Sequence, residues 1–258
     1  MLVIISPAKK LDWRPVDRPM DAPRFQEAAA QLAGFARQLP AAELGRLMHL
    51  SVALSALNHE RFQRFASEPA PEVLRPAALG FAGDTYVGLH AASLDSEARE
   101  WARGHLRILS GIYGLLRPED GIQEHRLEMG TKLATPRGKS LYDWWGPRIA
   151  RALNADAQAV GAGAVVNCAS KEYFAAVDTD TLALPVITPV FLDRNDGEEA
   201  RIVSFHAKRA RGAMARFVME NRLSDPADLR HFDAMGYRFQ PGKSCVAAPV
   251  FLREHPPR

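Results

Sequence analysis

The chain opens with Met1-Leu-Val-Ile-Ile-Ser-Pro-Ala-Lys-Lys10, a short β-branched run followed at once by a turn and two lysines. Such a run, stopped by Ser-Pro, predicts a buried β-strand over residues 1–6. Ligands of open α/β sheets meet the chain beyond the carboxyl ends of the strands. Lys9 and Lys10 are therefore candidates for binding an anion as point charges, although a solvated surface loop would have the same sequence.

Working outward from this strand, further elements follow along the chain. The segment Ala164-Val-Val-Asn-Cys-Ala169 predicts a second buried strand, and Ser170 is placed to cap a following helix. Residues 186–192 and 201–207 flank Asp193-Arg-Asn-Asp-Gly197, a pattern typical of a β-hairpin. Helical spacing of apolar residues predicts helices over residues 24–39, 41–50, 52–66, 94–109, 142–153 and 211–223. Helices and strands are interspersed without strict alternation, which favours the α/β class (mixed α+β), with one compact domain over residues 1–258 around an irregular mixed sheet.

Composition excludes several classes of protein. The 258 residues are 47% hydrophobic and 24% charged, which excludes a largely disordered chain, a collagen-like fibre and a coiled coil. No apolar run approaches the roughly 20 residues of a membrane span, and the N-terminal run is too short for a signal peptide. We therefore expect a cytoplasmic protein without membrane contact. The two cysteines fit a reducing compartment, and the scattered histidines predict no metal and no cofactor.

Two stretches concentrate positive charge within a chain whose net charge is only +3. Residues 201–222 hold six basic side chains against one acidic residue. Lys208, Arg209 and Arg211 precede the apolar spacing of the predicted helix, where exposed backbone N–H groups would add to the attraction for phosphate. The second stretch, residues 103–153, includes Arg107, Arg117 and Arg126. Both stretches predict anion binding, and a solvated charge run is the alternative.

The segment Leu109-Ser-Gly-Ile-Tyr-Gly-Leu-Leu-Arg-Pro118 lies within the second stretch. Gly111 and Gly114 enclose an apolar pair, and glycines let backbone amides approach a phosphate closely. This arrangement is similar to the hairpin of helix-hairpin-helix DNA-binding motifs. The two predicted helices around Ser51 are a competing location for such a motif, and helix capping explains Gly111 alone equally well.

Signals for catalysis are sparse. The sequence contains no phosphate-binding P-loop, no dinucleotide-binding glycine fingerprint and no Gly-x-Ser-x-Gly elbow. Asn167-Cys-Ala-Ser-Lys-Glu-Tyr173 offers a possible nucleophile and acid–base groups at a strand-to-helix turn, but a single cysteine in a buried strand is more often a core residue. Asp84 with Tyr86, and Arg126 beside Glu128, could complete a polar cleft or form structural pairs.

Several segments join into a longer pattern. They are Ile5-Ser-Pro-Ala-Lys-Lys-Leu-Asp12, Phe81-Ala-Gly-Asp-Thr-Tyr-Val-Gly-Leu89, Leu109-Ser-Gly-Ile-Tyr-Gly-Leu-Leu-Arg-Pro118, Arg126-Leu-Glu-Met-Gly130, Trp145-Gly146, Asn167-Cys-Ala-Ser170, Pro189-Val-Phe-Leu192 and Ala207-Lys-Arg-Ala-Arg-Gly212. In this order they resemble the peroxide stress protein YaaA family. The resemblance runs from residue 2 to about residue 223, and Cys168 stands where the family pattern leads us to expect leucine.

The resemblance implies a bacterial cytosolic protein of the oxidative-stress response that keeps unincorporated iron low. It implies the unusual topology of that family, a helix-hairpin-helix element, and binding of double-stranded or structurally distorted DNA through a basic cleft. Lys9, Lys10, Lys208, Arg209 and Arg211 could line that cleft. An enzyme acting on a small phosphorylated or acidic substrate is the alternative, with Lys9, Asn167, Ser170 and Lys171 as its candidates. The sequence names no protein partner and leaves enzymatic activity open.

Overall fold

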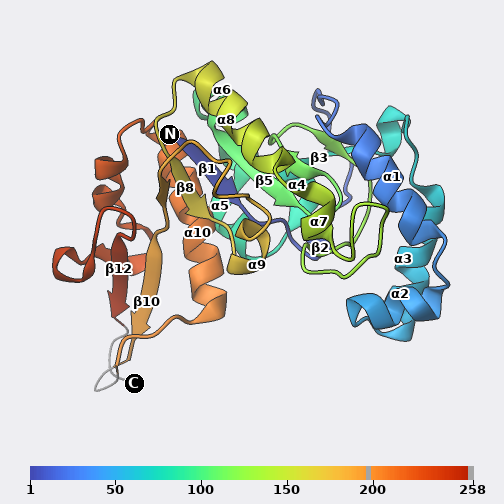
Figure 1. Ribbon diagram of the computed structural model, residues 1–258. Helices are drawn as coiled ribbons and strands as arrows, with labels where there is room; N and C mark the ends of the chain where they lie inside the picture. Colours follow the sequence, from blue (N-terminus) through green and yellow to red (C-terminus); the bar gives the residue numbers. More distant parts are fainter. Residues whose placement is uncertain (196–198, 255–258) are drawn as a thin grey trace.

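The centre of the molecule is a five-stranded sheet in a computed structural model that describes residues 1–195 and 199–254. The strand order is β6 (Gly114–Leu116), β5 (Leu106–Ser110), β1 (Leu2–Ile5), β8 (Val165–Cys168) and β9 (Val186–Ile187). β1 pairs in parallel with both β5 and β8, β9 pairs in parallel with β8, and only β6 is antiparallel. The predicted strand at residues 1–6 is thus the central strand of the sheet (Figure 1).

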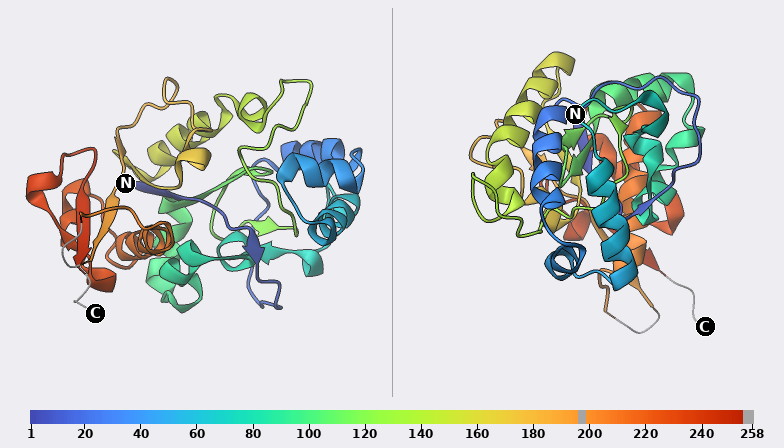
Figure 2. Two further views of the ribbon diagram at one scale, coloured as in Figure 1. Left: turned by 90° about the horizontal axis from the view of Figure 1, so that it is seen from below. Right: turned by 90° about the vertical axis from the view of Figure 1, so that its right-hand side faces the viewer.

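Helices cover both faces of this sheet. Seen from below, α8 (Arg148–Val160) lies on one side of the central strands, and α5 (Asp84–Leu89) and α10 (Ser204–Glu220) lie on the other (Figure 2). Because both faces of the sheet are covered, all four residues of β1 are fully buried. This explains why the strand is a continuous apolar run in the sequence. A single core of apolar side chains joins the sheet to these helices.

The contact between α5 and α10 is unusually close. A Cβ atom on Gly88 would lie 2.0 Å from the carbonyl oxygen of Arg209, and one on Gly212 would lie 1.8 Å from that of Thr85. Because only glycine leaves room for the facing backbone at both positions, the two helices touch backbone to backbone. This contact fixes the position of α10 relative to α5.

Two smaller units lie at opposite ends of the molecule (Figure 1). At one end, α1 (Gln26–Arg37), α2 (Ala41–Met48) and α3 (Val52–Arg64) pack together. At the other end, β10 (Val190–Arg194), β12 (Val250–Glu254) and β11 (Arg238–Phe239) form a three-stranded sheet. The 3-10 helices η3 (Pro226–His231), η4 (Ala234–Gly236) and η5 (Pro241–Lys243) belong to this C-terminal part.

Short elements complete the fold. Two antiparallel pairs join β2 (Lys10–Leu11) to β4 (Phe81–Ala82) and β3 (Arg75–Pro76) to β7 (Gly121–Ile122). The remaining helices are η1 (Pro71–Val73), α4 (Ala77–Gly80), η2 (Ala91–Ser93), α6 (Ser96–His105), α7 (Leu141–Trp145) and α9 (Lys171–Phe174). Within the described residues, no helix has both the length and the apolar character needed to cross a membrane.

The structure confirms the mixed α/β class and a compact single domain, and it corrects three predicted elements. The helix predicted over residues 94–109 ends at His105, and the next five residues form β5. The helix predicted over 142–153 is interrupted at Gly146-Pro147 between α7 and α8. The strand predicted over 201–207 is reduced to a single antiparallel bridge between Asp193 and Arg201, because Ser204 already begins α10, and β10 has its strand partner in the parallel β12. Residues 196–198 of the predicted turn lie outside the described residues.

Candidate anion-binding site

The carboxyl ends of the parallel strands β1, β5 and β8 meet at one edge of the central sheet. The segments that leave β1 and β8 are tied together there, because the backbone N–H of Ser170 donates to Ser6 Oγ at 2.8 Å. Ser170 Oγ accepts from the N–H of Tyr173 and caps α9, as the sequence predicted. The Tyr86 hydroxyl of α5 donates to the carbonyl oxygen of Ser6 at 3.2 Å. The strand edge and α5 therefore form one rigid support.

A three-residue ion cluster lies at this edge. Lys9 Nζ is 3.2 Å from Glu128 Oε1, and Arg126 Nε donates to the same oxygen at 2.9 Å. The side chain of Lys9 is 67% exposed, whereas those of Arg126 and Glu128 are 17% and 13% exposed. Lys9 can therefore reach a ligand from the surface while its charge is held at the strand end. Lys10 is also exposed and begins β2.

Lys208, Arg209 and Arg211 lie along α10, on the same side of the molecule as the strand edge. α5 makes the connection, since a Cβ on Gly83 would be 3.2 Å from Ala8 and one on Gly88 would contact the backbone of Arg209. Arg211 lies close enough to Cys168, at the end of β8, to affect its thiol electrostatically. The structure thus brings the predicted lysines of β1 and the cations of α10 onto one edge.

The expected contribution of helix N–H groups near Lys208 is wrong. α10 begins at Ser204, so Lys208 lies in its second turn and its N–H bonds within the helix. Like several other cations of the described residues, such as Lys10 and Arg151, these three have no partner. Among the residues that the structure describes, the side chains of Lys208, Arg209 and Arg211 form no hydrogen bond or ion pair, although Arg209 and Arg211 are half-buried.

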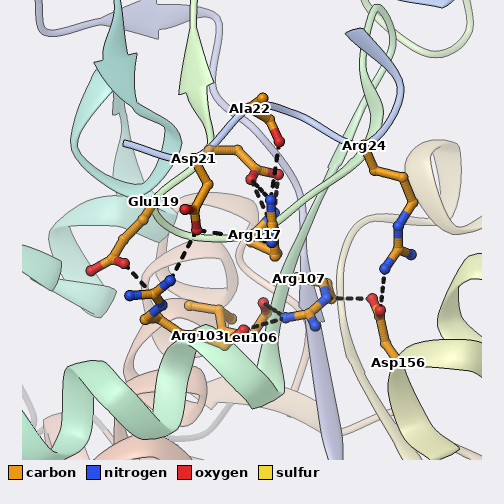
Figure 3. A network of polar contacts seen from close by, with 10 residues as sticks. Asp21, Ala22, Arg24, Arg103, Leu106, Arg107, Arg117, Glu119 and Asp156 are labelled. Atoms are coloured by element: carbon orange, nitrogen blue, oxygen red, sulfur yellow. Dashed lines mark hydrogen bonds and ion pairs between the residues drawn. The ribbon is translucent and has the colours of Figure 1, made fainter. Parts of the chain in front are cut away.

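Arg107 and Arg117 have a different role from the one that the sequence suggested (Figure 3). Arg107 is buried in β5, where its Nε donates to Asp156 Oδ2 at 2.6 Å and its Nη1 donates to the carbonyl oxygens of Arg103 and Leu106. Arg117 pairs with Asp120 at 2.8 Å and donates to the carbonyl oxygen of Ala22. Carboxylates and carbonyl groups bind both guanidinium groups, and Arg107 is buried as well, whereas the Arg117 side chain remains 38% exposed.

Gly111 and Gly114 are likewise structural. Gly111 lies in the turn between β5 and β6 and Gly114 begins β6, so residues 109–118 form a β-hairpin and not a pair of helices. A Cβ on Gly111 would lie 2.1 Å from the carbonyl oxygen of Leu127. Gly114 has a φ of +67° and lies against the ring of Trp145. Both glycines are buried, which removes them as sites for a phosphate.

Comparison with known proteins covers nearly the whole chain. The model of the family described as peroxide stress protein YaaA matches residues 1–243. The chain belongs to the peroxide stress protein YaaA family. It is 57% identical over 257 residues to a UPF0246 protein of Roseobacter denitrificans, with 99% of both chains covered. A UPF0246 protein of Ruegeria pomeroyi is 55% identical over 255 residues, again with 99% of both chains covered. The name of the YaaA family links the chain to peroxide stress.

The residues considered for catalysis in this YaaA family chain are engaged structurally. Burial raises the pKa of the Cys168 thiol to about 12, although Arg211 partly opposes the shift, so this thiol is a poor nucleophile. Asn167 Oδ1 accepts from the N–H of Ala169 at 3.0 Å and holds the turn after β8. Ser170 is a helix cap, and Lys171 is an exposed residue of α9. Asp84 begins α5, and Tyr86 supports Ser6.

Sequence reasoning missed the buried side chain of His125 at this edge and named Tyr173 only as the end of the segment considered for catalysis. Burial lowers the pKa of His125 to about 4, although its Nδ1–H donates to the carbonyl oxygen of Gln123, so the ring is neutral at physiological pH. Burial also raises the pKa of Tyr173, and Glu172 and Glu128 add to the shift. Neither residue has a sequence signal of its own, because each reaches the strand edge only through long-range packing. Within the described part of the chain, no group of three or more His, Cys, Asp or Glu side chains could hold a metal ion.

Proposed function

We propose that this chain is a DNA-binding protein of the bacterial response to hydrogen peroxide. The observation that carries the proposal is the set of three cations on α10 that lack carboxylate partners among the described residues, beside the lysines that follow β1. Unneutralised cations on a rigid helix contact phosphates without reading bases. The contact therefore positions double-stranded or distorted DNA along the strand edge.

The strength of such binding depends on phosphate neutralisation. Each lysine or arginine that contacts a phosphate releases condensed counterions, which lowers the logarithm of affinity by about 0.9 per decade of salt. Lys208, Arg209 and Arg211 would therefore contribute a slope of about three, and Lys9 and Lys10 would extend the contact along the surface. Distorted duplexes would bind more tightly than straight ones if the DNA must bend to reach both groups.

A second contact falls on the helical hairpin formed by α2 and α3. His49 adopts a left-handed conformation in the turn, and Ser51 Oγ accepts from the N–H of Leu54 at the start of α3. Val52 is 89% exposed at the tip, and Arg46 is exposed on α2. With residues 109–118 excluded, this hairpin is where we place the helix-hairpin-helix element. The protection of DNA against iron-driven damage rests on the family resemblance and is part of the proposal.

Fluorescence anisotropy with labelled intact, bulged and junction DNA across a salt series tests the proposal. We expect that Lys208→Ala/Arg209→Ala/Arg211→Ala lowers affinity about tenfold or more and reduces the salt slope by about three. The matched control, Arg151→Ala/Arg230→Ala/Lys243→Ala, also removes three exposed cations but takes them from α8, η3 and η5. This control should retain the wild-type slope.

The two triple variants have the same net charge, so a general loss of positive charge cannot separate them. An equal drop in slope for both variants would contradict a localised DNA contact on α10. Absence of DNA binding by folded wild-type protein even at low salt would overturn the proposed function itself. Arg46→Ala in the same assay measures the contribution of the α2–α3 hairpin.

A further inference from the structure

One buried oxygen atom at the strand edge is left without a partner. Glu128 Oε1 accepts from both Lys9 and Arg126, but Glu128 Oε2 is buried and forms no hydrogen bond to any described residue. A buried carboxylate oxygen without a donor is costly, since the desolvation of a charged group is then uncompensated. The arrangement therefore requires a donor that the described chain does not supply.

The missing donor has a defined place. Glu128 lines a small cavity of about 20 Å³ at the carboxyl ends of β1 and β5, which is enough for one water-sized group. Its walls include Pro7, Ser110, Gly111, His125 and Tyr173. The ring of His125 is held by an edge contact with Phe81 at 5.9 Å and by its bond to Gln123. The floor is rigid and accepts only a small group such as a hydroxyl or an amine.

The floor of the cavity favours a hydrogen-bond donor, whereas its mouth favours an anion. Lys9 lies at the rim of the cavity. Within the described residues, its ammonium group forms an ion pair with Glu128 alone. An ammonium group has three donors, so Lys9 keeps donors for an incoming anion. Arg126 uses its Nε for Glu128, and its terminal nitrogens form no hydrogen bond within the described residues. A ligand with an anionic group at the rim and a hydroxyl or amino group at the floor satisfies both ends.

We propose that this pocket binds a phosphate monoester that carries a hydroxyl or amino donor, the chemistry of a mononucleotide or a sugar phosphate. The phosphate lies on Lys9 and Arg126, and the donor reaches Glu128 Oε2. This site shares Lys9 with the proposed duplex contact but does not depend on the cations of α10. The same chemistry has two sources, a free small molecule and the phosphorylated end of a DNA strand.

Isothermal titration with deoxyadenosine 5′-monophosphate, ribose 5-phosphate, deoxyadenosine and inorganic phosphate tests the proposal. We expect at least one of the two monoesters to bind at least tenfold more tightly than inorganic phosphate or the nucleoside. Glu128→Gln keeps an oxygen for Lys9 and Arg126 but places an NH₂ group at the cavity. It should weaken binding of that monoester at least tenfold and leave binding of inorganic phosphate unchanged.

Glu172→Gln is the matched control, because Glu172 accepts from the N–H of Gly130 at 3.0 Å and does not line the cavity. It should bind the monoester like wild type. Lys9→Met changes an exposed side chain and so does not threaten folding, and it should weaken both the monoester and inorganic phosphate. Thermal melts verify that each variant is folded.

Competition with a short 5′-phosphorylated single strand separates the two sources. Displacement of the monoester by the strand, with loss of strand binding in Glu128→Gln, identifies a DNA end as a ligand of the pocket. No displacement identifies a free phosphate monoester. The proposal is overturned if neither monoester binds more tightly than inorganic phosphate, if Glu128→Gln and Glu172→Gln behave alike, or if a crystal soaked with the monoester shows only a water molecule on Glu128 Oε2. The α10 triple variant should bind the monoester normally, so failure of the duplex proposal remains distinguishable.

Discussion

Arg103, Arg107 and Arg117 (Figure 3) and three cations of α10, Lys208, Arg209 and Arg211, come from the two stretches that concentrate basic residues, and their surroundings are opposite. In the first group, Arg103, Arg107 and Arg117 contact carboxylates at distances between 2.6 and 3.9 Å. In the second group, Lys208, Arg209 and Arg211 have no such partner in the described part of the chain. The first group stabilises the fold, whereas the second leaves its charge available to a ligand.

This difference shows why a count of local charge does not locate an anion site. Two of the carboxylates that neutralise the first group are distant in sequence, with Asp21 82 residues from Arg103 and Asp156 49 residues from Arg107. A window of residues 103–153 contains only part of that compensation. The fold is needed to see which cations are neutralised by carboxylates and which are not. Replacing the carboxylates one at a time tests each ion pair.

The largest expected effect follows from replacing the buried carboxylate. Asp156→Asn leaves Arg107 buried without its ionic partner and also removes the ion pair with Arg24, so we expect a loss of about 3–5 kcal/mol in the free energy of unfolding. Denaturant titration measures this loss. The double variant Arg107→Met/Asp156→Leu should recover most of it, because both buried charges are then absent. Equal destabilisation in the single and double variants would show that packing, and not charge, explains the loss.

An intermediate effect is expected in acid. Burial alone would raise the pKa of Asp156, but its hydrogen bonds and ion pairs with Arg24 and Arg107 outweigh burial and hold that pKa below its ordinary value. A carboxyl whose folded pKa is depressed stabilises the protein above the unfolded pKa of about 3.9, and this contribution disappears as the pH falls through the folded pKa. Stability measured from pH 6 to pH 2 should therefore fall less steeply in Asp156→Asn than in wild type. Parallel profiles for the two proteins would contradict the assignment.

The smallest effect is expected at the exposed side of the same network. Asp21 pairs with Arg103 at 3.1 Å and with Arg117 at 3.9 Å, and all three side chains are more than a third exposed. Asp21→Asn should cost less than about 1 kcal/mol and should lose its effect in high salt. The α10 triple variant provides the comparison, since removal of unpaired cations should leave the melting temperature nearly unchanged. A large loss in Asp21→Asn would mean that the exposed pairs act as one unit with Asp156.

Local patterns predicted the elements whose signals are local. The run Leu2–Ile5, the cap at Ser170 and the helices of residues 24–66 are confirmed, because turn residues and apolar spacing define them within a few positions. β5 was missed because Ile108 and Leu109 also continue the helical face of residues 94–105, and short apolar runs do not distinguish the two structures. The pairing of Val190 with Val250 spans 60 residues and has no local signal.

In the candidate site, too, some residues have a local sequence signal and others depend on long-range packing. Lys9 was identified because the end of a strand is visible in sequence, and the structure places it at the edge shared by β1, β5 and β8. Arg107 could not be recognised as a buried side chain without knowledge of Asp156. The unpartnered oxygen of Glu128 is also invisible in sequence, because it results from the packing of residues 125–128 against the ends of β1 and β5.

The central position of β1 also has a consequence for synthesis on the ribosome. Val3 pairs with Leu106 on one side and with Val166 on the other. β1 is therefore synthesised first, and both of its partner strands are translated more than a hundred residues later. At about 5–20 residues per second, this delay lasts on the order of 5–20 s for the nearer partner alone. β1 therefore has no β5 partner until Leu106 is made and no β8 partner until Val165 is made, and a fragment that stops before Val165 exposes one whole edge of it.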